Sequence, residues 1–489
     1  MKHKVSIIGS GFSSLSAACH LAHSGYEVEV FEKNEQLGGR AQQYCYEGFK
    51  FDMGPTWYWM PDVFDRFFHE LGSKTSDYYQ IELLDPGYRV YFGENDYVDI
   101  DGSIDKILKT FESIEPGSAQ KLLQFLNKAK SNYNIAINDL VYKPGLSPME
   151  LVTKETILEL KQFVFTIRDV VSKNFKNEKI RQILEFPVLF LGAKPSNTPS
   201  FYSFMNHADF GLGTWYPKGG MKSVVDGIVK LAKELGVVFH HNSPISTIHV
   251  SNKGQVESIV TNGETKPVDI LISGADYKHS ESLLPRGYQA YSDSYWNKKT
   301  MAPSSLLFYV GFSKKLKHVL HHTLFFDSSF DDHAVEIYDN PSWPQEPLFY
   351  ASFPSITDGD VAPEGNEAAT FLIPIAPDLE DSEAIRDKYF NIILTRLEQL
   401  TNQNLRDDIL FKKSYCVQDF KDDYNSFKGN AYGLANTLMQ TAFLRPGIKS
   451  KKVKNLYFTG QLTVPGPGVP PALISGKLVS DLVIKENSL

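Results

Sequence analysis

Residues 4–32 read KVSIIGSGFSSLSAACHLAHSGYEVEVFE, and this stretch decides the fold. Its first part, Lys4–Ile8, is a short apolar run without alternation, which is typical of a strand buried on both faces of a parallel sheet. A glycine turn at residues 9–14, GSGFSS, leads into a helix that we expect over residues 13–24. Glu27–Phe31 is predicted to form a second strand. The order of strand, glycine turn, helix and strand is that of a unit that binds a dinucleotide.

The glycine turn has the features that a bound pyrophosphate requires. Gly9 permits the tight turn, and Gly11 lets the backbone approach the pyrophosphate at the positive end of the helix. Glu32, about twenty residues further on, is placed to accept hydrogen bonds from the adenosine ribose. Ser14 stands where a third glycine usually allows close packing of helix and strand, and the alternative reading is a βαβ unit that binds no nucleotide. The predicted contacts are Gly9, Ser10, Gly11, Phe12, Ser13, Ser14, Glu32 and Lys33.

Two further glycine motifs follow the second strand. Gly38-Gly39-Arg40 can turn backbone N–H groups toward a second phosphate, and the arginine adds charge and a rigid fork. In FDMGPTW, residues 51–57, a glycine-proline turn allows the chain to run close to a flat ring. An acid after the second strand argues against NADP, and the two additional motifs favour FAD over NAD. The added cofactor contacts are predicted to be Gly38, Gly39, Arg40, Gly54, Pro55 and Thr56.

Together, these motifs resemble the flavin-dependent amine oxidase and carotenoid desaturase superfamily, and residues 51–57 are most similar to the bacterial-type phytoene desaturases. The resemblance implies FAD and an α/β fold. In that fold a Rossmann-like FAD-binding domain (GR2-type) is interleaved with a mixed-sheet substrate domain and a helical lobe. We accordingly expect FAD-binding segments at 1–100, 211–276 and 441–489, a helical lobe or substrate region at 101–210, and the substrate-domain sheet and helices at 277–440.

The C-terminal region carries the second block of the resemblance. Residues 455–460, NLYFTG, indicate a strand, and PGPGVPP at 465–471 precedes a helix expected over about 472–486. Such a helix would direct its positive N-terminus at the O2 side of a flavin, where charge accumulates on reduction. By resemblance, the backbone of Ile245 should lie against the adenine. The other cofactor residues that the resemblance implies are Gly460, Gln461, Gly468, Val469 and Pro470, with Gln461 near the place of an acid in many relatives.

Composition limits the classes of partner. A net charge of −8 and a pI near 5.9 give no reason to expect a nucleic-acid partner. Three scattered cysteines suggest a reducing compartment, and we expect no signal peptide before the first strand. A run of about eighteen apolar residues is absent, so we expect no transmembrane helix. No histidine or cysteine spacing suits a metal, and the single nucleotide motif predicts one flavin and no bound NAD.

Two surface-related patterns leave alternatives open. Trp57 and Trp59 belong to an aromatic patch just past the proposed flavin turn, and they can be core residues, line an apolar substrate or touch lipid. A basic cluster formed by Arg445 and the lysines of residues 449–454 is either a solvated face or a contact for anionic lipid headgroups.

The resemblance implies desaturation of phytoene in several steps, as far as lycopene, with hydride transfer to the flavin and loss of a neighbouring proton. We assign no acid or base to that proton. A long apolar polyene substrate implies a cytoplasmic protein held peripherally on the inner face of the membrane, with quinone or oxygen as the electron acceptor. The alternatives are another carotenoid oxidoreductase, namely a hydroxycarotenoid 3,4-desaturase or an isomerase, and a non-enzymatic binding protein on the same fold.

Overall fold

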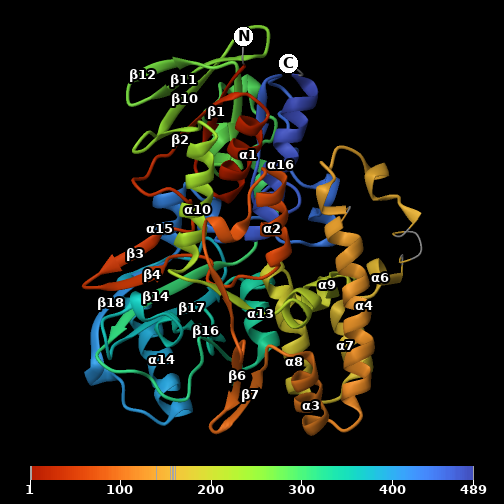
Figure 1. Ribbon diagram of the computed structural model, residues 1–489, viewed down its shortest axis with the longest axis vertical. Helices are drawn as coiled ribbons and strands as arrows, with labels where there is room; N and C mark the ends of the chain where they lie inside the picture. Colours follow the sequence, from red (N-terminus) through yellow and green to blue (C-terminus); the bar gives the residue numbers. More distant parts are fainter. Residues whose placement is uncertain (1–2, 139, 155, 157–158, 160, 488–489) are drawn as a thin grey trace.

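A five-stranded parallel sheet lies in the upper half of the molecule as drawn in Figure 1. The computed structural model describes residues 3–138, 140–154, 156, 159 and 161–487. The strand order is β19–β13–β1–β2–β9, so the first strand of the chain is central. The strands are β1 (Lys4–Ile8), β2 (Glu27–Phe31), β9 (Val238–His240), β13 (Ile270–Ser273) and β19 (Leu456–Phe458).

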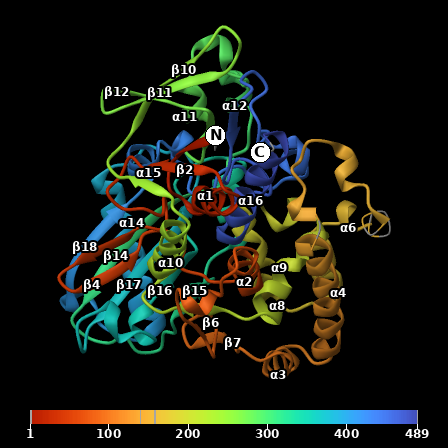
Figure 2. The same ribbon diagram turned by 45° about the horizontal axis from the view of Figure 1, so that its top comes forward.

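The two faces of this sheet pack against different layers, which explains why its strands are apolar without alternation. Val5 and Ile7 enter a core formed with helices, whereas Ile8 enters a core formed with a three-stranded antiparallel sheet. Figure 2 shows that sheet at the top, near α11 and α12. The helices are α1 (Phe12–His23), α2 (Pro61–Glu70), α10 (Met221–Glu234) and α16 (Val469–Glu486). The outer layer consists of β10 (Ile245–Val250), β11 (Val256–Thr261), β12 (Glu264–Pro267), α11 (Tyr277–Ser282) and α12 (Asp293–Asn297).

A seven-stranded mixed sheet forms the second body, at the lower left of Figure 1. Its order is β18–β14–β17–β16–β15–β6–β7, and only the pairing of β6 with β15 is parallel. Helix α14 packs its apolar side chains on this sheet in one core. The elements are β6 (Tyr88–Gly93), β7 (Asp96–Ile100), β14 (Ser304–Phe312), β15 (His322–Phe325), β16 (Phe349–Ser352), β17 (Glu367–Ile375), β18 (Ile409–Tyr415), α13 (Phe330–Tyr338), α14 (Glu383–Thr401) and α15 (Val417–Tyr424).

A helical lobe lies at the lower right of Figure 1. Its apolar faces share one core with β6, β7 and the N-terminal half of α16, so the lobe is joined to both other bodies. The lobe comprises α3 (Ile104–Ile114), α4 (Ser118–Asn138), α6 (Lys161–Val164), α7 (Ile167–Asn174), α8 (Glu178–Glu185), α9 (Phe204–Asn206) and a π-helical turn at His207–Gly211. Two strand pairs complete the fold: β3 (Gln43–Tyr46) with β4 (Phe49–Asp52), and β5 (Ile81–Leu83) with β8 (Trp215–Pro217).

The boundaries of the sheets differ from the chain segments that the sequence suggested. Strands β6 and β7 fall within residues 1–100, which we assigned to FAD binding, but they pair in the seven-stranded sheet. Residues 139, 155, 157–158 and 160 of the 101–210 segment lie outside the described residues. Within the described ranges, no helix combines the length and the apolar composition that crossing a membrane requires.

Candidate cofactor site and cavity

One large cavity, of about 630 Å³, joins the glycine turn of the first βαβ unit to the mixed sheet and the helical lobe. Every residue that the sequence suggested for cofactor or substrate lines this cavity, except Ser14. The predicted residues that line it are Gly9, Ser10, Gly11, Phe12, Ser13, Glu32, Lys33, Gly38, Gly39, Arg40, Gly54, Pro55, Thr56, Trp57, Trp59, Ile245, Gly460, Gln461, Gly468, Val469 and Pro470.

The two N-terminal glycine motifs touch each other. Gly11 and Gly38 form an isolated parallel bridge, and a Cβ atom on Gly39 would lie 3.0 Å from the Cα atom of Gly11. Glu32 directly follows β2 and accepts hydrogen bonds from the backbone N–H and the hydroxyl of Ser10, at 2.9 and 2.6 Å. Two backbone segments and one buried carboxylate therefore meet where a nucleotide would enter.

Ser14 faces away from the cavity, toward the sheet. Its hydroxyl is fully buried, and it has no hydrogen-bond partner among the described residues. A Cβ atom on Gly274, just after β13, would lie 2.0 Å from the Ser14 Oγ atom. The close packing that a third glycine usually permits is thus achieved here by a glycine on the opposite side of the contact, because Gly274 leaves room for the serine.

Arg40 is a partly buried cation on the cavity wall. Its guanidinium donates to the Ser426 hydroxyl and the Asn430 carbonyl at 3.1 and 3.3 Å, and it lies over the ring of Tyr424. With its amide oxygen turned inward, Gln461 accepts from both terminal nitrogens at 3.1 Å. Burial lowers the pKa of Arg40, although the Asp276 carboxylate opposes this shift. The Arg40 Nε atom has no partner among the described residues.

The Gly54-Pro55 turn packs against the backbone of the same arginine. A Cβ atom on Gly54 would lie 2.2 Å from the Arg40 carbonyl oxygen, so only glycine fits at this position without a backbone shift. At the other side of the cavity, Gly468 precedes α16 with a φ of +114°. Val469 and Pro470 open this helix toward the cavity, and the two prolines leave few N–H donors at its positive end.

Several cavity residues were not predicted from the sequence. Ser243 and Pro244 precede Ile245 on the wall, and Ser243 donates its N–H to the Glu32 carbonyl at 2.7 Å. Asn430 and Tyr432 come from the glycine-rich stretch 429–433, whose composition was visible but suggested no role. No local pattern in residues 429–433 indicates that this stretch folds against Arg40.

The residues present fit a flavin adenine dinucleotide. A buried carboxylate suits the ribose hydroxyl groups, and glycine backbone at two close approaches suits the phosphates. The partly buried guanidinium with one unpaired N–H faces the cavity, where it suits an anionic group better than an apolar one. Among the described residues, no cluster of histidine, cysteine, aspartate and glutamate could hold a metal ion.

Beyond the cofactor motifs the cavity wall becomes mainly apolar. Trp57 stacks on the ring of His322, with centroids 4.1 Å apart, and the Trp59 indole donates to the Thr214 hydroxyl at 2.8 Å. The apolar wall is drawn from both the lobe and the mixed sheet. It includes Met60, Ala136, Ile137, Phe163, Phe186, Leu189, Phe201, Phe204, Met205, Leu324, Phe326, Phe330, Ile337, Leu348 and Leu372.

The basic cluster near residue 450 is divided in the structure. Arg445 is buried and donates to the Asn436 side chain and to the Gln461 carbonyl at 2.5 and 2.7 Å, so it belongs to neither a solvated face nor a lipid contact. Lys449 forms an ion pair with Glu486 at 2.7 Å. The pattern of basic residues alone could not separate the interior arginine from the surface lysines.

Comparisons with known proteins agree with this geometry. A family model described as flavin containing amine oxidoreductase matches residues 12–484. The chain is 41% identical over 486 residues to the carotenoid 3,4-desaturase of Haloarcula japonica, covering 99% of this chain and 98% of that protein. It is 31% identical over 494 residues to the zeta-carotene-forming phytoene desaturase of Myxococcus xanthus, covering 98% and 93%. The solved structure of an oxidoreductase from Methanosarcina mazei has a TM-score of 0.66 at 16% identity, over 98% and 100% of the chains, which concerns the fold alone.

Proposed function

We propose that this chain, which belongs to the flavin containing amine oxidoreductase family, introduces a double bond near the end of an acyclic carotenoid that carries oxygen on its end group. The expected α/β fold, the FAD cofactor and the oxidoreductase class are confirmed by the family match and its relatives. Bound FAD supplies the hydride acceptor for such an oxidation. The observation that carries the finer proposal is a polar patch on the apolar wall of the cavity.

That patch consists of Ser305, Tyr338 and Tyr432. Ser305 is 1% exposed and lines the cavity, and its hydroxyl lies close enough to that of Tyr432 to lower the pKa of this tyrosine. Burial raises the pKa of both Tyr338 and Tyr432, and Tyr432 adds to the shift of Tyr338, so the two tyrosines are neighbours. An oxygenated end group can form hydrogen bonds with these hydroxyl groups, each worth about 0.5–1.5 kcal/mol net, whereas a hydrocarbon cannot.

The position of the new double bond is proposed from similarity. The relative at 41% identity is named for 3,4-desaturation, which places its chemistry near one end of the carotenoid. The second candidate is desaturation of phytoene toward lycopene, which the relative named as a phytoene desaturase favours. Phytoene is a pure hydrocarbon, so its recognition would rest on cavity shape alone.

The test is a comparison of substrates with the purified, FAD-loaded protein. Phytoene, lycopene and a 1-hydroxylated lycopene are each offered in vesicles, and the products are separated by chromatography. We expect conversion of the hydroxylated carotenoid, and conversion of phytoene alone would overturn the proposal. Ser305→Ala should reduce the preference for the hydroxylated over the hydrocarbon substrate about tenfold. The control is Ser304→Ala, which should leave the preference unchanged, because the Ser304 hydroxyl already donates to the Gly429 carbonyl at 2.5 Å.

We also propose that the cavity opens onto a membrane, on its cytoplasmic face. Leu146 and Met149 are 58% and 71% exposed and lie next to Gly145, Ser147 and Glu150, which line the cavity. Exposed apolar side chains around an opening suit a lipid surface. A quinone dissolved in that bilayer, or oxygen, is the proposed final electron acceptor.

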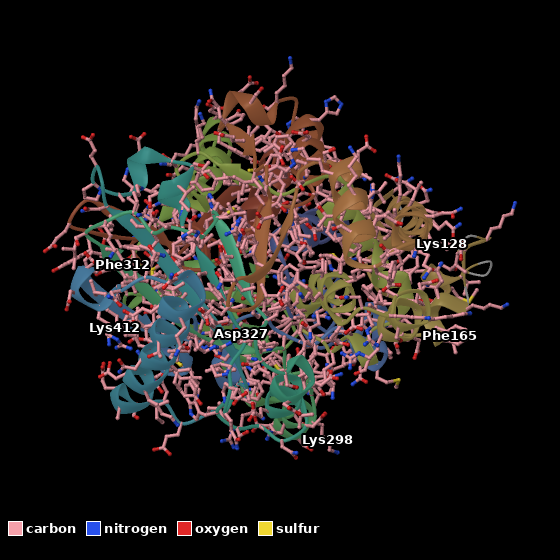
Figure 3. The ribbon with its side chains drawn as sticks, turned by 90° about the horizontal axis from the view of Figure 1, so that it is seen from below. Lys128, Phe165, Lys298, Phe312, Asp327 and Lys412 are labelled. Atoms are coloured by element: carbon pink, nitrogen blue, oxygen red, sulfur yellow. The ribbon has the colours of Figure 1, made fainter. Side chains whose placement is uncertain are left out.

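Vesicle flotation tests this placement. Figure 3 shows Phe165, another exposed side chain of the lobe, across the molecule from Lys412 on β18. Met149→Glu and Phe165→Glu should each weaken binding to vesicles several-fold. Leu410→Glu, on the exposed surface of β18, is the matched control. Equal loss in all three variants, or no vesicle binding by the wild type, would contradict the proposal.

A further inference from the structure

We propose that Tyr350 is the residue that takes the proton from the substrate, and that His322 and Thr56 hold its hydroxyl for this task. The inference rests on the proposed function, since it assigns the proton that carotenoid desaturation must release. Tyr350 lies in β16 of the mixed sheet and lines the cavity. Thr56 directly follows the Gly54-Pro55 turn that faces the cofactor motifs.

The Tyr350 hydroxyl lies between two partners. Its oxygen is 2.7 Å from His322 Nδ1 and 2.8 Å from Thr56 Oγ1. The imidazole of His322 is held flat against Trp57, with an angle of 10° between the rings. The hydroxyl is therefore fixed from two directions, by a loop next to the cofactor site and by a strand of the mixed sheet.

His322 is placed to receive a proton through this hydrogen bond. The residue is fully buried, and its Nε2 atom has no partner among the described residues. Burial lowers the pKa of His322 well below its usual range, so the ring is neutral at rest and releases a proton readily once it has gained one. The ring centroid of His321 lies 4.5 Å from that of His322. The Nδ1 atom of His321 lies 2.8 Å from the hydroxyl of Thr357, a residue that is partly exposed.

The proton balance of the step is simple. With bound FAD as the acceptor of the allylic hydride, the C–H bond on the neighbouring carbon would break, and its electron pair would become the new double bond. The released proton passes to Tyr350 Oη, while the proton of that hydroxyl moves to His322 Nδ1. A carbon next to a cation is strongly acidic, so a weakly basic phenol is sufficient.

Three other titratable groups on the wall are already engaged. Both ring nitrogens of His333 are used, one at 2.8 Å from the Pro374 carbonyl and the other accepting from the Leu348 N–H at 3.1 Å. Glu150 accepts from two backbone N–H groups at the exposed rim. Glu32 is bonded to Ser10 within the nucleotide motif. Tyr350 lines the cavity, and its hydroxyl is hydrogen-bonded to the buried imidazole of His322, which can accept its proton.

The test compares Tyr350→Phe and His322→Phe with Tyr309→Phe in the FAD-loaded protein. Tyr309 donates to the Met53 carbonyl at 2.9 Å, beside the same loop, and serves as the control for losing a phenol bonded to this region. Tyr350→Phe should lower turnover about 100-fold, in the range that general acid–base groups supply, and the control should change it less than about threefold. A substrate deuterated at the carbon that loses the proton should show a larger isotope effect in Tyr350→Phe than in the wild type.

A second readout does not depend on turnover. Nitrogen NMR of the flavin-free protein, with His322→Phe used to identify the signals, should show His322 Nδ1 as a hydrogen-bond acceptor that Tyr350→Phe abolishes. Wild-type turnover in Tyr350→Phe, or an unchanged isotope effect, would overturn the relay while leaving the proposed function intact. Absence of any carotenoid conversion by the wild type would overturn the proposed function, and the relay with it.

Discussion

Replacing Arg40 with methionine should separate the stability of the flavin-free protein from its affinity for FAD. The guanidinium is partly buried and carries a charge that no directly bonded carboxylate balances. Methionine has a similar length without that charge. Since replacing a buried ion with an apolar side chain is often neutral or stabilising, the flavin-free variant should be at least as stable as the flavin-free wild type.

The Arg40→Met variant should, however, bind FAD more weakly than the wild type does. One charge-assisted hydrogen bond contributes about 1.5–3 kcal/mol, so removal of the Arg40 donor should raise the Kd for FAD about 10- to 150-fold. Titration of FAD into the deflavinated protein, followed by flavin fluorescence, measures this directly. Excess FAD should then stabilise the variant less than the wild type by the same free energy.

The control for this variant is Arg445→Met. Arg445 is buried, and its Nε atom also has no partner among the described residues, but it does not line the cavity. Its replacement should change the Kd for FAD less than about threefold. A Kd for Arg40→Met within threefold of the wild type would refute the assignment of Arg40 to the cofactor.

Three further predictions concern stability. Ser14→Ala removes a buried hydroxyl without a partner and should raise the free energy of unfolding by about 1–2 kcal/mol in urea titrations, with unchanged FAD affinity; a loss of stability would contradict this. Gly476→Ala would place a Cβ atom 2.3 Å from the Ser13 carbonyl oxygen, and should lower stability by about 1–3 kcal/mol; an unchanged unfolding midpoint would show that α1 and α16 separate freely. Burial raises the pKa of Asp209 to about 8, so wild-type stability should fall as the pH rises from about 4 through 8, and Asp209→Asn should flatten that fall in melting curves at pH 5, 7 and 9.

The elements around the nucleotide-binding half of the site could be predicted from the sequence, because its residues follow each other at short, fixed distances. The turn at residues 9–14 needs only the strand before it and the helix after it, and the structure has both, at Lys4–Ile8 and Phe12–His23. The role of Ser14 could not be derived in this way. Its environment depends on Gly274, which is distant in the chain and meets it only through the pairing of β1 with β13.

The substrate half depended on contacts that no local pattern encodes. Adjacent residues of a strand point to opposite faces, so the sequence pair His321-His322 does not indicate a site by itself. Both are buried, and His322 meets Tyr350 through the antiparallel register of β15 and β16. The polar patch at Ser305 likewise forms only when β14, α13 and the 429–433 stretch come together.

The central claim is that this protein oxidises a carotenoid with its bound FAD, and one anaerobic experiment tests it most directly. The FAD-loaded protein is mixed without oxygen with vesicles that contain a 1-hydroxylated lycopene, and the absorbance of flavin and carotenoid is followed together. The account predicts bleaching of the flavin with formation of one equivalent of a carotenoid that has one more double bond. A flavin that stays oxidised in the presence of this and every other acyclic carotenoid would contradict the account.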